Sequence, residues 1–104
     1  MYVSSLPENA EYDYVVVGSG SAGCVVANRL TAGGRHSVLL LEAGRRDTNY
    51  KLHIPALVAR VLNDERWTWP SLTEPQMHLD GQRRKWPRGR VIGGCSSING
   101  NLLK

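Results

Sequence analysis

Residues 14–23 read Tyr-Val-Val-Val-Gly-Ser-Gly-Ser-Ala-Gly, and the rest of the expected fold follows from them. The apolar run Tyr12–Val17 is typical of a strand buried on both faces in a parallel sheet. Cys24–Thr31 continues with apolar side chains at helical spacing, and Gly33-Gly34 predicts the end of that helix. A second apolar run, Ser37–Leu41, predicts a strand parallel to the first. We therefore expect a β-α-β unit spanning residues 12–44.

The glycines of this stretch have the spacing of a phosphate-binding turn. Gly18 permits the tight turn, Gly20 lets the backbone approach a pyrophosphate, and Gly23 lets the helix pack closely on the strand. The N–H groups at the start of such a helix bind anions. Glu42 ends the second strand, where its carboxylate can accept hydrogen bonds from both ribose hydroxyls of an adenosine and repel a 2′-phosphate. We expect a dinucleotide. Arg45 and Arg46 could accommodate a 2′-phosphate, so NADP stays open as a less favoured ligand. The alternative is that these glycines only form structural turns.

A second group of small and polar residues runs from Arg90 to Asn101. Gly93-Gly94 allows a close backbone approach, and Cys95–Ser97 offers small groups and N–H donors. Asn99 adds an amide and tolerates unusual backbone angles. The segment lacks the motifs of a nucleotide-triphosphate P-loop and of a hydrolase nucleophile elbow. It suits a diphosphate or the polar edge of a planar ligand, and a tight structural turn is the alternative.

The net charge is +4, and basic residues are concentrated between Arg83 and Arg90. Such a run around Trp86 is compatible with nucleic-acid binding, but we favour a solvated face with Arg90 directed to the cofactor. We therefore expect no nucleic-acid partner. No metal-ligand or triad spacing surrounds the three histidines, which are His36, His53 and His78, so we expect no metal site and no catalytic residue.

From residue 45 onward the sequence is largely polar, basic or rich in turn formers. Pro55 predicts the start of a short helix that ends near Leu62, and Trp67–Trp86 is expected to be loop with a short hairpin. Cys24 and Cys95 have no CxxC or zinc spacing, so we expect free thiols and a reducing compartment. We see neither a secretory signal nor a membrane-spanning run, and we predict the cytoplasm. So much irregular sequence favours a piece of a larger protein.

Three segments together resemble one known family. They are Asp13–Cys24 with Leu41–Gly44, Trp69 with Thr73–Gln76, and Gly89–Gly100. In this order they resemble the N-terminal portion of the glucose–methanol–choline (GMC) oxidoreductases, the group that contains choline dehydrogenases and aryl-alcohol oxidases. The resemblance implies the α/β class: a Rossmann-like FAD/NAD(P)-binding β-α-β unit, part of a doubly wound parallel sheet, with cofactor-covering loops. Residues 1–104 would form the N-terminal part of an FAD-binding domain, with residues 45–104 covering FAD and the substrate domain absent.

The resemblance also implies the cofactor and its contacts. Gly18–Gly23 and Glu42 would hold the ADP half of FAD, the second glycine segment would wrap the diphosphate and approach the isoalloxazine, and Trp69 would line the surroundings. Some members attach FAD covalently to a histidine at the position of Ile98, which cannot form that bond, so we expect non-covalent FAD. The cofactor-binding residues that we predict are Gly18, Ser19, Gly20, Ser21, Ala22, Gly23, Glu42, Ala43, Trp69, Arg90, Val91, Gly94, Cys95, Asn99, Gly100 and Asn101.

The activity implied by the resemblance is FAD-dependent oxidation of the CH–OH group of an alcohol, with hydride transfer to flavin N5. The general base of the family is a histidine near the C-terminus of the full enzyme, which would lie beyond Lys104. The expected partners are a small alcohol substrate and the remainder of the same enzyme. An FAD-containing hydroxynitrile lyase of the same family and a fragment of an NAD-dependent dehydrogenase are the alternatives.

Overall fold

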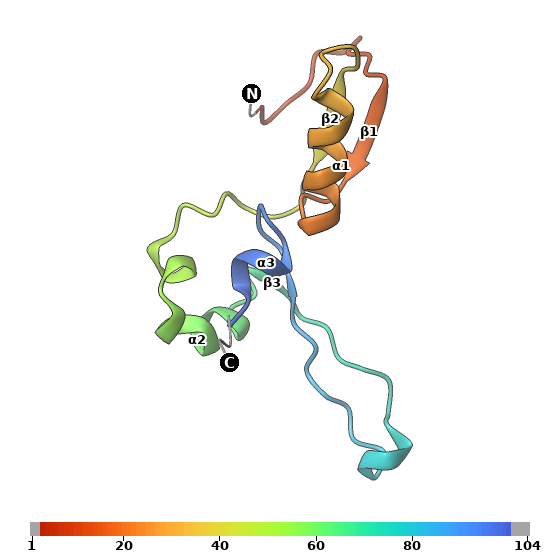
Figure 1. Cartoon of the computed structure of the whole chain (residues 1–104). Coiled ribbons are helices and arrows are strands. Elements are labelled where there is room, and N and C mark those ends of the chain that lie inside the picture. Colours follow the sequence, from red (N-terminus) through yellow and green to blue (C-terminus); the bar gives the residue numbers. More distant parts are fainter. Residues whose placement is uncertain (1–2, 101–104) are drawn as a thin grey trace.

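The computed structural model describes residues 3–100 and begins with the expected β-α-β unit (Figure 1). Strand β1 (Tyr14–Val17) leads into helix α1 (Ser21–Thr31), which returns to strand β2 (Val38–Leu41). The two strands are parallel, with Tyr14 opposite Val38 and Val17 opposite Leu41. Helix α1 packs against both strands. The β-α-β prediction is therefore confirmed.

Helix α1 begins at Ser21, directly after the glycine turn. Gly20 is its N-cap, so Gly23 lies inside the first turn. A Cβ on Gly23 would collide with the carbonyl oxygen of Gly18, so this glycine is required for close packing of the helix on the turn. The C-terminal end is as expected: Gly34 has φ +64°, and its N–H donates to the Thr31 carbonyl at 2.9 Å.

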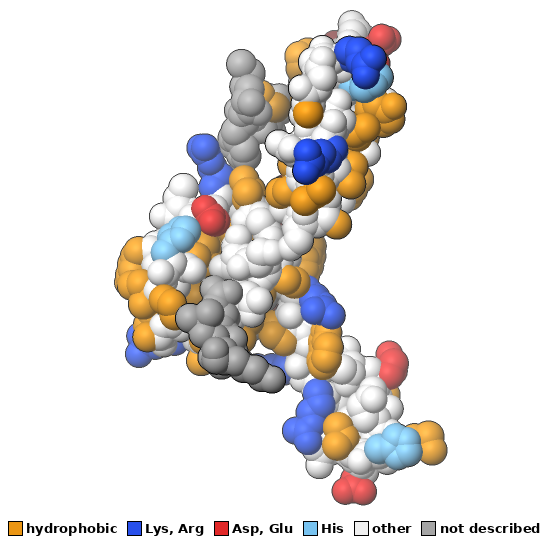
Figure 2. Space-filling model, viewed as in Figure 1, with side chains coloured by type: hydrophobic (Ala, Val, Ile, Leu, Met, Phe, Trp, Pro, Cys, Tyr) orange, Lys and Arg blue, Asp and Glu red, His pale blue; other side chains and the backbone are white. Residues whose placement is uncertain are grey.

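The burial expected for the two strands is not observed. Val17 is 82% exposed, and Val15 and Leu41 are exposed as well. Parallel sheets are buried when helices cover both faces, whereas here a single crossover helix packs on a two-stranded sheet. Figure 2 shows apolar side chains at the surface of this unit.

The segment after β2 forms short helices around a small core. It contains η1 (Tyr50–His53), η2 (Pro55–Leu57) and α2 (Val58–Leu62), so the helix expected from Pro55 is split in two. Near the end of the described chain, α3 (Cys95–Ile98) packs against α2 and η1. The sequence analysis did not predict α3, because most of its residues are small turn formers. The buried core consists of Val61, Trp67, Val91 and Ile98.

A long hairpin projects from this core, at the lower right of Figure 1. Strands β3 (Thr68–Trp69) and β4 (Arg88–Gly89) are antiparallel at its base. Further bridges pair Leu72 with Lys85 and Gln76 with Gln82, and η3 (Met77–Leu79) forms the tip. The hairpin is thus longer than expected, because its strands close beyond Trp86.

The hairpin makes the molecule elongated. The radius of gyration is 16.9 Å and the principal extents are 52 × 31 × 29 Å. A compact domain of this length would have a radius of gyration of about 13 Å. Among the described residues, no helix is long and apolar enough to cross a membrane.

Candidate cofactor site

The two glycine segments meet, although they lie far apart in the sequence. A Cβ on Gly94 would lie 2.9 Å from the Cα of Gly20, so the two backbones are in direct contact. The Gly93 N–H donates to the Ser19 carbonyl at 3.0 Å. The hydroxyls of Ser21 and Ser96, 75 positions apart, are hydrogen-bonded at 2.5 Å. One composite surface therefore includes the α1 turn and the segment before α3.

A second set of main-chain contacts fixes this arrangement. Arg45 forms a parallel bridge with Val91, and its carbonyl accepts the Ile92 N–H at 2.9 Å. A Cβ on Gly44 would collide with the backbone of Arg90. Val91 is fully buried, so its side chain can support the site but cannot touch a ligand. The chain leaving β2 is thereby joined to the chain entering α3.

A cavity of about 610 Å³ lies between these segments. This is the size of a small-molecule or cofactor site. Most of its wall was predicted from the sequence, but Val17, Leu41 and Gly89 were not. Val17 and Leu41 end the parallel strands, where α/β sheets bind ligands. Their position at the strand ends could therefore have predicted them as lining residues. The lining residues are Val17, Gly18, Gly20, Leu41, Glu42, Ala43, Trp69, Gly89, Gly94 and Cys95.

The start of α1 has the donors that a pyrophosphate requires. No side chain caps this helix, and no acidic residue lies in its first turn. The first N–H groups of an α-helix have no partner within the helix and carry the positive end of its dipole. A Cβ on Gly20 would meet open space, and Gly20 lines the cavity. The residues present therefore fit the close approach of an anionic diphosphate.

Glu42 lines the same cavity, but its carboxylate already accepts several protein hydrogen bonds. Oε2 accepts the N–H of Ser19 at 2.8 Å and its hydroxyl at 2.7 Å, and Oε1 accepts the Gly44 N–H at 2.7 Å. Partial burial by itself would raise the pKa of Glu42, but the donors from Ser19 and Gly44 outweigh it and lower that pKa below its usual value. Glu42 is therefore held as a carboxylate beside the cavity.

Trp69 and Arg90 form one side of the site. The Arg90 guanidinium lies 4.6 Å from the centroid of the Trp69 ring, and Trp69 lines the cavity. Trp67, by contrast, is buried in the core. Trp67 precedes β3 and supports the fold, whereas Trp69 lies in β3 and lines the site.

The remaining predicted residues lie around this centre. Ser21, Ala22 and Gly23 form the first turn of α1. Asn99 lies with Ile98 beside a second cavity of about 400 Å³. Gly100 lies next to Val58, whereas Asn101 is outside the described residues.

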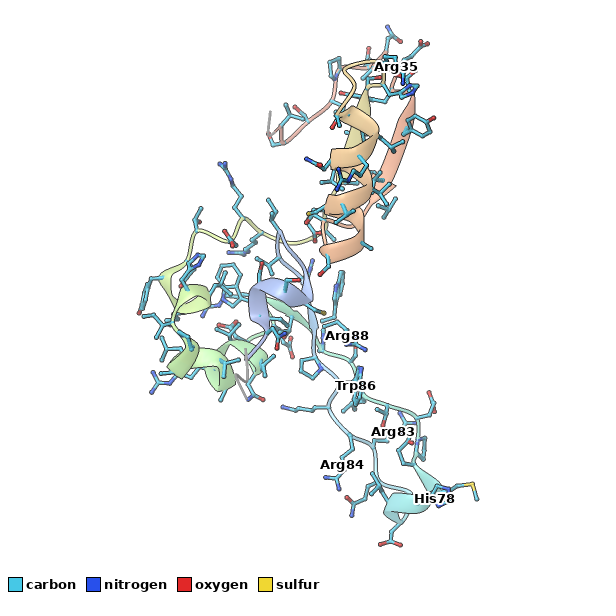
Figure 3. All side chains as sticks on the ribbon, viewed as in Figure 1. Arg35, His78, Arg83, Arg84, Trp86 and Arg88 are labelled. Carbon is cyan, nitrogen blue, oxygen red and sulfur yellow. The ribbon has the colours of Figure 1, made fainter. Side chains whose placement is uncertain are left out.

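The basic run is mostly remote from the cavity. Arg83, Arg84 and Lys85 are exposed on the hairpin, and Figure 3 shows Arg83 and Arg84 along it. Arg88 lies 5.3 Å from the Trp86 ring centroid. Within residues 3–100, no group of His, Cys, Asp and Glu could hold a metal ion, and both cysteines are free.

Comparison with known proteins identifies the family. The sequence profile of the GMC oxidoreductases matches residues 12–103. An oxygen-dependent choline dehydrogenase of Photobacterium profundum is 49% identical over 92 residues, which cover 88% of this chain and 16% of that protein. An alcohol dehydrogenase (acceptor) of Pseudomonas putida is 52% identical over 88 residues, which cover 85% of this chain and 16% of that protein.

Solved structures of two oxidases also match this chain. A pyridoxine 4-oxidase from Mesorbium loti matches with a TM-score of 0.80 and 37% identity, over 86% of this chain and 18% of that one. A variant of the formate oxidase of Aspergillus oryzae RIB40, solved to study the effect of a mutation on FAD modification, matches with a TM-score of 0.78 and 28% identity, over 90% of this chain and 17% of that one. The fold is consistent with Rossmann-like FAD binding, and FAD is the cofactor that these comparisons support. The chain belongs to the GMC oxidoreductase family.

Proposed function

We propose that this chain forms the FAD-binding portion of an oxidoreductase that acts on the CH–OH group of an alcohol. The observation that carries the proposal is the cavity between Gly18–Gly20 and Gly94-Cys95, with Glu42 in its wall. The family supports FAD as its occupant. When bound, FAD supplies the hydride acceptor at flavin N5.

The described residues suit distinct parts of FAD. The N–H groups at the start of α1 would hold the diphosphate, and Glu42 would accept a hydrogen bond from the adenosine ribose. Gly94 and Cys95 would approach from the second segment, and Trp69 with Arg90 would cover the cofactor.

Non-covalent FAD is part of the proposal. Ile98 is 5% exposed and belongs to the core around Trp67, and its side chain has no group that could bond to a flavin. Asn99 and Gly100 follow it and would approach the flavin from the end of α3, together with Asn101, which lies outside the described residues.

The wider architecture and the reaction depend on more polypeptide than is described here. The matched part of this chain spans 16% of the length of the choline and alcohol dehydrogenases that it resembles. We propose that further elements cover the exposed faces of β1 and β2 to complete a doubly wound sheet. We also propose that the general base and the substrate contacts come from the same enzyme outside this chain. The free cysteines support a reducing compartment such as the cytoplasm.

The names of the relatives support an alcohol as the substrate. Two of them are a choline dehydrogenase and an alcohol dehydrogenase, and the first solved structure described above is a pyridoxine 4-oxidase. The specific alcohol would be set by the residues outside this chain.

Titration of the chain with FAD, NAD⁺ and NADP⁺ tests the cofactor. We expect saturable binding of FAD, seen as a shift of its visible absorbance and quenching of its fluorescence, and a much weaker response to the nicotinamide dinucleotides. Preferential binding of NAD⁺ would contradict the proposal and favour the dehydrogenase alternative. In the complete holoenzyme, anaerobic bleaching of the flavin by an alcohol separates an oxidoreductase from a lyase that uses FAD only structurally.

A further inference from the structure

Ser19 occupies the middle of the candidate site without lining its cavity. The residue is 2% exposed, so it lies beneath the surface that a ligand would touch. Its N–H and its hydroxyl both donate to Oε2 of Glu42, at 2.8 and 2.7 Å. Both donors of Ser19 are therefore committed to one carboxylate oxygen.

The same residue also joins Glu42 to the second glycine segment. The Gly93 N–H donates to the Ser19 carbonyl at 3.0 Å and is 3.3 Å from the Ser19 hydroxyl oxygen. The hydroxyl thus lies between an acceptor on the residue that follows β2 and a donor on the segment before α3. A single buried hydroxyl connects the two parts of the site.

The hydrogen bonds of Glu42 limit how it can receive a ligand. A carboxylate has about four acceptor positions. Ser19 takes both positions on Oε2, and the Gly44 N–H takes one on Oε1. The Ala43 N–H contributes least to the lowered pKa of Glu42, so the remaining acceptor position on Oε1 is the one that can receive a ligand, and its direction is fixed as long as Ser19 holds Oε2.

We propose that Ser19 is a positioning residue: its hydroxyl fixes the Glu42 carboxylate so that Oε1 meets a hydroxyl of the adenosine ribose. This inference rests on the proposed function, because it presumes that an ADP moiety occupies the cavity. It differs from the expectation that Glu42 receives both ribose hydroxyls through a free carboxylate.

The chain contains a matched control for this hydroxyl. The N–H and hydroxyl of Ser37 both donate to Oδ2 of Asp13, at 2.6 and 2.8 Å. The chemistry is the same as in the Ser19–Glu42 pair, but Ser37 and Asp13 are exposed and lie at the opposite end of β1 and β2. Ser37→Ala removes an equivalent hydrogen bond outside the site.

The experiment measures the affinity of the full chain for FAD, for ADP and for 2′,3′-dideoxy-ADP, with Ser19→Ala and Ser37→Ala as variants. We expect Ser19→Ala to weaken FAD and ADP by about fivefold to tenfold, the size of a typical net hydrogen bond. Dideoxy-ADP lacks the ribose hydroxyls, so its affinity should change by less than about twofold. Ser37→Ala should change none of the three affinities by more than about twofold, because its bond is exposed.

The readouts separate positioning from general support of the fold. A Ser19→Ala variant that loses equal affinity for ADP and dideoxy-ADP, or that loses none, would overturn the inference while leaving FAD binding intact. Failure of the wild-type chain to bind FAD at all would instead overturn the proposed function, and the inference with it. As a ligand-independent check, NMR titration of the carboxyl groups should show that the pKa of Glu42 rises in Ser19→Ala and is unchanged in Ser37→Ala.

Discussion

Two serine–carboxylate pairs stand at opposite ends of the β1–β2 pair. At the start of the strands, the N–H and hydroxyl of Ser37 donate to Asp13; at their carboxyl ends, the same groups of Ser19 donate to Glu42. Both hydrogen-bond sets lower the pKa of their carboxyl group. The Asp13 pair is exposed, whereas Ser19 is buried beside a cavity. The same local motif therefore supports a strand end in one place and a candidate ligand site in the other.

The two pairs differ because the second glycine segment packs against the carboxyl ends of the strands. Gly93 and Gly94 contact the carboxyl ends of the strands through Ser19 and Gly20. This contact buries Ser19 and forms the wall of the cavity. Parallel strands, their connecting turns and a helix N-terminus meet at this end, which is why open α/β sheets bind ligands there.

The largest difference in FAD affinity is expected from glycine substitutions at the two ends of the β1–β2 pair. Gly20→Leu places a side chain where the diphosphate would approach, and its extended backbone tolerates any residue. We expect a loss of FAD affinity on the order of 100-fold, or about 2.7 kcal/mol. Gly33→Leu is the control, because a Cβ there makes an ordinary contact with Arg35 at 3.7 Å. Equal losses in the two variants, measured by FAD fluorescence quenching, would place the cofactor elsewhere.

The next largest difference in FAD affinity is expected between substitutions of Glu42 and Asp13. Glu42→Gln keeps the shape of the side chain but removes the charge that accepts the Ser19 hydrogen bonds and would receive the ribose. We expect FAD affinity to fall by about tenfold, the range of a charge-assisted hydrogen bond. Asp13→Asn should leave FAD affinity within about twofold, because Asp13 is exposed at the far end. Calorimetric titration of both variants measures the difference, and a tenfold loss in Asp13→Asn would remove the distinction between the ends.

The pH dependence of stability should also differ between the pairs. Each carboxyl has a folded pKa below its unfolded value, so its contribution is complete above the unfolded pKa and is lost as the pH falls through the folded pKa. We expect the free energy of unfolding to decrease below about pH 4.5. Glu42→Gln should flatten this decrease more than Asp13→Asn does, because solvent screens the exposed pair. Urea unfolding followed by circular dichroism across that pH range measures it; the reverse order of the two variants would contradict this ranking.

The smallest effect concerns the exposed link between the glycine segments. The Ser21 and Ser96 hydroxyls are hydrogen-bonded at 2.5 Å on the surface, whereas the Ser19 link is buried. Ser96→Ala should therefore weaken FAD binding by only about twofold, since exposed hydrogen bonds exchange readily with water. An effect larger than that of Ser19→Ala, in the same fluorescence assay, would mean that the exposed link is the more important one.

Much of the fold was predictable where the signal is local. The apolar runs gave both strands, and the Gly33-Gly34 pair gave the end of α1. Local patterns failed for α3, because small residues such as Ser96 and Ser97 have no preference strong enough to indicate a helix. They also underestimated the hairpin, whose pairing of Leu72 with Lys85 depends on contacts across the turn.

The linear order of residues was sufficient to identify the β-α-β unit, the glycine turn and Glu42 as a candidate dinucleotide site. These features depend on neighbouring residues and on side-chain periodicity, which are properties of a short stretch of chain. The contact of Gly94 with Gly20, the burial of Ser19 and the hydrogen bonds that orient Glu42 emerged only in three dimensions. The Gly94–Gly20 contact joins segments separated by most of the chain, and Ser19 and Glu42 are 23 positions apart. No local preference specifies which distant backbone or side chain will pack against such a turn.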